Sequence, residues 1–145
     1  MIALYHLPKR TQRDRRSRRM ASAMAELSRE EGWRWMDWRE AMDGDPRYVA
    51  DARVFLMVVA GFQDLEPLEP CRDRLRHLKV AAAVLAPDED LILAVQSYSP
   101  CFIALSDADD AAVPEVLKCL SRETSVCAFR ERSVEKIYKP RRAVP

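Results

Sequence analysis

Apolar runs alternate with segments of helical periodicity along most of this chain, and this alternation restricts the fold more than any other feature of the sequence. The clearest run, VFLMVVA at residues 54–60, contains no polar residue, and similar runs occupy residues 80–86 and 101–105. Strands of a parallel sheet have this pattern because helices cover both of their faces. The sequence therefore predicts an α/β domain with a buried parallel sheet.

The other elements are predicted from periodicity and from the positions of glycine and proline. Strands are expected at residues 1–7, 33–38, 54–60, 80–86 and 101–105. Helices are expected at residues 18–31, 65–78, 88–98 and 113–122, with a short or broken helix at residues 39–52. Residues 106–110 are expected to form a polar loop, residues 126–129 an extra edge strand and residues 133–138 a short helix.

This order of elements also predicts a topology. Parallel neighbours need crossover helices, which are right-handed and cover both faces of the sheet. Five strands in a chain of 145 residues favour the strand order 2-1-3-4-5. We therefore expect a doubly wound, flavodoxin-like α/β sandwich as one domain over residues 1–130, with residues 131–145 as a basic tail or linker.

No membrane segment or export signal can be recognised in the sequence. No apolar stretch approaches the roughly 18 residues that a transmembrane helix needs. The amino-terminal MIALYHLPKR lacks the basic head and long apolar run of a signal peptide. We expect a cytoplasmic protein that does not bind a membrane.

The cysteines and histidines form no recognisable metal or redox motif. No CxxC pair occurs among the four cysteines, Cys71, Cys101, Cys119 and Cys127, and His6 and His77 are far apart in the sequence. Reduced, buried thiols are the simplest interpretation. No metal and no cofactor are predicted.

Basic residues gather after the first predicted strand, although the net charge of the chain is only +1. They are Lys9, Arg10, Arg13, Arg15, Arg16, Arg18 and Arg19. Together with helix N–H groups they could bind phosphate, a nucleotide or nucleic acid; alternatively they form a solvated surface. A P-loop is not expected, because the chain has three glycines and none lies in this segment.

The stretch VAAAVLAPDEDLILAVQSYSPCFIALSDADDAAVPEVLKCL resembles the fourth strand, fourth helix, fifth strand and last helix of bacterial response-regulator receiver domains. The resemblance extends over residues 1–122 in the order and length of the elements. In that family an acidic pair follows strand one, and a phosphoacceptor aspartate ends strand three. A serine or threonine ends strand four, and a lysine ends strand five.

This chain lacks those residues at the matching positions. Leu7–Lys9 follow the first strand, Val59–Gly61 end the third, Leu85 and Ala86 end the fourth, and Leu105–Asp107 end the fifth. Asp64 lies beyond the third strand, where the intervening residues are expected to carry it out of the pocket. The resemblance therefore implies a pseudo-receiver that is not phosphorylated on aspartate.

Function is predicted from this combination. We expect a non-catalytic regulatory module that binds another regulatory protein or a second copy of itself, and not an enzyme, because no nucleophile, base and orienting group can be placed together. The receiver resemblance implies a partner face centred on Tyr98, Pro100, Phe102 and Val113. The alternative is an anion, nucleotide or nucleic-acid binder that uses residues 9–19.

Overall fold

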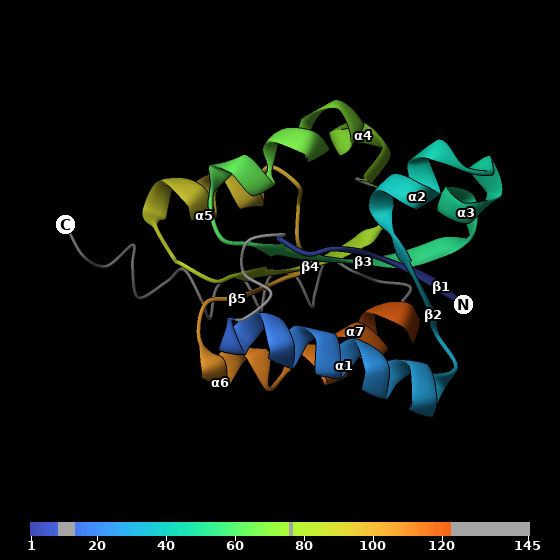
Figure 1. Ribbon diagram of the computed structural model, residues 1–145, viewed down its shortest axis with the longest axis horizontal. Helices are drawn as coiled ribbons and strands as arrows, with labels where there is room; N and C mark the ends of the chain where they lie inside the picture. Colours follow the sequence, from blue (N-terminus) through green and yellow to red (C-terminus); the bar gives the residue numbers. More distant parts are fainter. Residues whose placement is uncertain (9–13, 76, 123–145) are drawn as a thin grey trace.

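A five-stranded parallel sheet lies between two layers of helices (Figure 1). The structure is a computed structural model that describes residues 1–8, 14–75 and 77–122. The strands are ordered β2-β1-β3-β4-β5, and all neighbours are parallel. They are β1 (Ile2–His6), β2 (Arg34–Asp37), β3 (Ala52–Val59), β4 (Lys79–Val84) and β5 (Phe102–Ala104). The predicted flavodoxin-like α/β fold and its strand order are confirmed.

The helices divide between the two faces of the sheet. Helices α1, α6 and α7 cover one face, and α2 to α5 cover the other (Figure 1). The α-helices are α1 (Arg15–Glu31), α2 (Trp38–Asp43), α3 (Pro46–Asp51), α4 (Arg72–Leu75), α5 (Glu89–Gln96), α6 (Asp107–Asp110) and α7 (Val113–Arg122). Two 3₁₀ helices, η2 (Phe62–Asp64) and η3 (Glu66–Cys71), follow β3.

Strand β3 supplies both halves of the hydrophobic core. Its side chains alternate between the faces, so Phe55 and Met57 pack with the α2–α5 layer while Leu56 and Val58 pack with α1 and α7. All four side chains are completely buried. The unbroken apolar run in the sequence is therefore explained by burial on two sides.

Helix α1 begins at Arg15 rather than at the predicted Arg18, because Asp14 caps it. The Asp14 carboxylate accepts hydrogen bonds from the backbone N–H groups of Arg16 (2.8 Å) and Ser17 (3.2 Å). At the other end, Gly32 has φ 71°, the left-handed conformation that glycine adopts without a Cβ clash.

Two predictions about local structure were wrong. Residues 65–78 do not form one helix; they form η3 and the short α4, because Pro67 and Pro70 lack the N–H that an α-helix needs. Residues 106–110 are not merely a loop, since Asp107–Asp110 form α6. The Ser106 hydroxyl caps α6 by accepting the N–H of Asp109 at 3.3 Å.

Several predictions lie outside the described residues. They concern the strand at 126–129, the helix at 133–138, the boundary near residue 130 and the tail at 131–145. Among the residues that are described, no helix is long and apolar enough to cross a membrane.

Candidate functional site

The carboxyl ends of parallel strands meet at one edge of the sheet, and doubly wound folds bind their ligands there. Here β1 ends at His6, β3 at Val59, β4 at Val84 and β5 at Ala104. The loops that follow these strands therefore form the first candidate site. Two clusters of polar side chains occupy it.

Arg16, in the first turn of α1, covers the ends of β4 and β5. Its Nη1 donates to the carbonyl oxygen of Val84 at 2.6 Å and, more weakly, to that of Leu105 at 3.4 Å. Its Nη2 donates to the carbonyl oxygen of Ala104 at 3.2 Å. One guanidinium thus satisfies carbonyl groups that a parallel sheet otherwise leaves open at this edge.

Asp110 of α6 neutralises that guanidinium. The Arg16 Nε lies 2.6 Å from Asp110 Oδ2, and Nη2 lies 2.9 Å from Oδ1, a bidentate arrangement. The Asp110 side chain is completely buried, and that of Arg16 is 12% exposed. The hydrogen bond from Asp110 raises the pKa of Arg16 above its ordinary value. Arg16 and Asp110 therefore form a buried ion pair at the carboxyl ends of β4 and β5.

A second cluster joins β1 to the loop after β3. The Trp38 Nε1–H donates to His6 Nδ1 at 2.9 Å, so the proton of a neutral His6 is placed on Nε2, which donates to the Asp64 carbonyl at 2.8 Å. Burial lowers the pKa of His6, although the nearby Asp64 opposes this shift. His6 is therefore held as a neutral imidazole between two fixed partners.

The carboxylate of Asp64 is also engaged locally. Its Oδ2 accepts the backbone N–H groups of Ala60 at 2.7 Å and Gly61 at 3.2 Å. Asp64 thus folds back on the end of β3 and closes the turn. Within residues 1–8, 14–75 and 77–122, no three His, Cys, Asp or Glu side chains are grouped so that they could hold a metal ion.

The predicted basic segment is only partly described. Lys9, Arg10 and Arg13 lie outside the described residues. Arg18 is exposed, while Arg15 and Arg19 lie 3.9 and 3.5 Å from the Asp107 carboxylate. These three guanidinium groups remain candidates for an anion.

Two parts of that prediction require correction. Arg16 points inward and is bound to Asp110, so it does not form part of an exposed basic surface. The N–H groups of Arg16 and Ser17 at the start of α1 are not open to an external anion either, because the Asp14 carboxylate accepts both.

The predicted partner face is also wrong in its central residues. Tyr98 (3% exposed), Phe102 (8%) and Val113 (0%) are buried, and Pro100 is buried with them. Tyr98 packs in the core between the sheet and the α2–α5 layer, while Phe102 and Val113 pack in the core between the sheet and α1 and α7. They cannot form the centre of an exposed surface.

Among the described residues, the exposed large apolar side chains near this region are Leu93 of α5, which is 55% exposed, and Phe62 of η2, which is 49% exposed. Of these two, Phe62 lines a cavity. This cavity has a volume of about 490 Å³ and lies between η2, η3 and α5. Tyr98 lines this cavity from below the surface, and Glu66, Glu69 and Arg72 give it a charged rim. The Arg72 Nε is buried and has no hydrogen-bond partner among the residues that the structure describes.

The sequence did not identify Asp110, Trp38 or Asp64 as partners in these clusters. Asp110 follows Arg16 by 94 residues, and nothing in the local pattern of either residue predicts their contact. Trp38 was expected to pack around β2, and it is buried as expected, but its bond to His6 was not predicted. One signal was available: an acidic residue and a basic residue each follow a strand at the same edge of the predicted sheet.

Comparisons of the chain with protein-family models, with curated proteins and with solved structures found no match.

Proposed function

We propose that this chain is a non-catalytic regulatory module with a receiver-like fold, which acts by binding another protein. The observation that carries the proposal is the position of the Arg16–Asp110 pair. This pair covers the carboxyl ends of β4 and β5, and the His6–Asp64 hydrogen bond joins the ends of β1 and β3, where a doubly wound domain of this strand order would bind a ligand.

Phosphoryl transfer to aspartate needs a carboxylate nucleophile and a cation held by several oxygen ligands. At the described strand ends, the one nearby carboxylate after β3 is that of Asp64, and it already accepts two backbone N–H groups. Beside β4 and β5, both oxygens of the Asp110 carboxylate are bound by Arg16, so this carboxylate is not free to hold a divalent cation. Both features support a module that does not accept a phosphoryl group.

The test of this half of the proposal is incubation with acetyl phosphate and Mg²⁺. We expect the intact mass and the backbone amide spectrum to remain unchanged. A functional receiver treated in the same way is the positive control. A phosphoryl adduct on an aspartate of this chain would contradict the proposal.

The cavity beside Phe62 is the surface that best supports protein binding. A half-exposed aromatic ring at a hollow is typical of an interface anchor, because its burial removes a large apolar area from water. Glu66 and Glu69 at the rim favour a partner that presents basic groups around an apolar side chain.

A photo-crosslinking amino acid at position 62 tests this surface in cells of the native host. We expect a discrete adduct from position 62 and none from position 22, where Ser22 is exposed on the opposite helical layer. The mass of the adduct distinguishes another protein from a second copy of the chain. Equal adducts from both positions, or none from position 62, would contradict the proposal that the Phe62 cavity binds a protein.

Anion binding through α1 is the second candidate, and it is favoured by the exposed Arg15 and Arg18 and the partly exposed Arg19 on the first turns of the helix. Fluorescence anisotropy of a labelled oligonucleotide at about 50 and 200 mM salt is the test, since phosphate contacts weaken steeply with salt. Replacing these three arginines by glutamine should abolish binding. Replacing Arg39, Arg47 and Arg122 instead is the matched control.

A further inference from the structure

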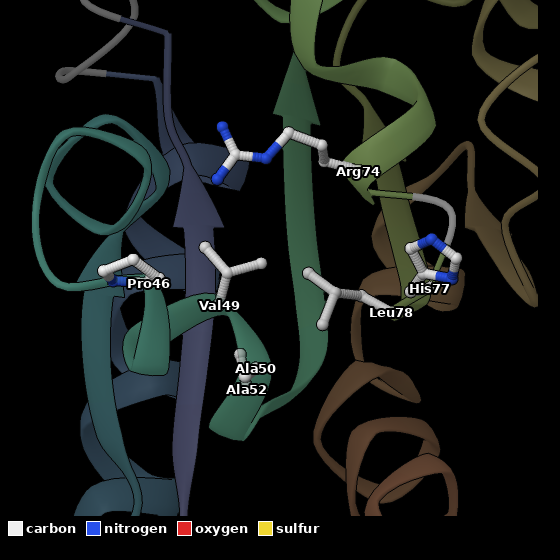
Figure 2. A pocket seen from close by; sticks show the side chains of 7 residues that line it. All are labelled: Pro46, Val49, Ala50, Ala52, Arg74, His77 and Leu78. Carbon is white, nitrogen blue, oxygen red and sulfur yellow. The ribbon is translucent and has the colours of Figure 1, made fainter.

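A second cavity lies at the opposite edge of the sheet, where β3 and β4 begin. Its volume is about 370 Å³, and it lies between α3 and α4 (Figure 2). The lining residues are Pro46, Val49, Ala50, Ala52, Arg74, His77 and Leu78. No element of the function proposed above uses this cavity.

Five of the seven residues that line the cavity have apolar side chains. Val49 and Leu78 point toward it from opposite sides, and Ala52 at the start of β3 contributes a small side chain that leaves space (Figure 2). Pro46 lies at the rim on the α3 side. A cavity of this size with apolar walls is at the lower end of the range of small-molecule sites.

Arg74 brings a positive charge to these apolar walls. Its side chain extends from α4 toward Val49, on the opposite side of the cavity (Figure 2). Within the described part of the chain, the Arg74 guanidinium has no hydrogen bond or ion pair, and no acidic residue is among those that line the cavity. The exposed imidazole of His77 lies on the far rim. The cavity thus combines an unneutralised guanidinium with the apolar side chains of Val49, Ala52 and Leu78.

We infer that this cavity binds a small carboxylate with an apolar body. A guanidinium pairs with a carboxylate through two parallel N–H···O bonds, which gives the ligand a fixed orientation. The apolar body would then lie against Val49 and Leu78. Inorganic phosphate fits less well, because it has no apolar part to lie against Val49 and Leu78.

Benzoate is a suitable probe, and amide chemical shifts of the whole chain report its position. Titration is expected to move the signals of Ala50, Ala52 and Leu78 with one saturable curve. Arg74→Gln should weaken binding by about tenfold or more, because a hydrogen bond to a charged group is lost. Arg122→Gln, an exposed arginine on the opposite helical layer, should leave the curve unchanged.

A second variant keeps the test informative. Ala50 is exposed, so Ala50→Trp should fold normally and fill the cavity mouth, and it should abolish the benzoate shifts. Benzamide, which lacks the charge, and acetate, which lacks the apolar body, should each bind at least about tenfold more weakly than benzoate.

Three results would overturn the inference. The first is the absence of saturable shifts at the lining residues. The second is an unchanged curve in Arg74→Gln. The third is equal affinity for inorganic phosphate, which would show an anion site without recognition of an apolar body. None of these results bears on the carboxyl edge or on the Phe62 cavity, so the function proposed above is tested separately.

Discussion

A buried charge that loses its partner costs more than the intact pair contributes, and this rule applies to Arg16 and Asp110. The Arg16 side chain is 12% exposed in the intact pair, and Asp110→Ala removes the carboxylate that binds it. We expect the free energy of unfolding to fall by about 3–5 kcal/mol, measured by urea denaturation. Glu31→Ala, which breaks the exposed pair with Arg122, should change it by less than about 0.5 kcal/mol. Equal effects of the two variants would show that the buried pair is not a major contact.

The pH dependence of stability follows from His6. Burial lowers its folded pKa below the ordinary value of 6.5, so between the two values the unfolded state holds more protons. The contribution of His6 is therefore complete above about pH 6.5 and is lost as the pH falls below it. In His6→Gln this part of the acid dependence should disappear from urea denaturation curves between about pH 5 and 8.

His77→Gln is the control for this pH experiment. His77 is exposed, so the acid dependence of this variant should match that of the unchanged protein. The Nε1–H signal of Trp38 offers a second measurement, because protonation of His6 Nδ1 removes the acceptor of that hydrogen bond. A Trp38 signal that does not shift on acidification of the folded protein would contradict the assignment.

At the scale of elements, α1 depends on its first residues for both its start and its docking. Asp14→Ala removes the acceptor of two backbone N–H groups and should cost about 1 kcal/mol in the free energy of unfolding. Asp14→Asn should retain most of that stability, since its side-chain oxygen still accepts. Thermal denaturation followed by circular dichroism compares the two, and equal losses would show that the cap is not responsible.

The elements with strong periodicity could be predicted from the sequence. Helix α7 matches the predicted bounds, and β3 and β4 differ from them by two residues or fewer at each end, because continuous burial leaves a continuous apolar pattern. Residues 65–78 were not predictable in the same way. Their leucines keep helical spacing and are buried, yet two prolines change the backbone beneath them.

The candidate site could be located from the sequence but not its contents. Parallel topology alone identifies the carboxyl edge, and the missing receiver residues are visible at the strand ends. Whether an arginine faces solvent or the sheet changes with a shift of one or two residues along a helix, because each residue turns it by about 100°. The sequence did not fix the start of α1 to that accuracy, and Asp14 caps it. The exposure of Tyr98 and Phe102 likewise depends on tertiary packing, which local patterns do not report.

For the whole molecule, the two half-cores share the strands of one sheet, and β3 contributes buried side chains to both. Phe55→Ala and Leu56→Ala each create a cavity on opposite faces of β3 and should cost about 2–5 kcal/mol. In both variants, tryptophan fluorescence and far-ultraviolet circular dichroism should give coincident urea transitions, because the strands of the shared sheet couple the two faces. Separate transitions in either variant would show that the two layers unfold independently.

The contact between Arg16 and Asp110 also has a consequence in time. The two residues are 94 positions apart, and ribosomes add roughly 5–20 residues per second, so their emergence is separated by roughly 5–20 seconds. During that interval the first helix exists without the acid, and without the strand-end carbonyls, that hold its arginine. The contacts of Arg16 with Asp110 and with the ends of β4 and β5 therefore form only after α6 has been synthesised. The first helix of the chain is thus among the last to complete its native contacts.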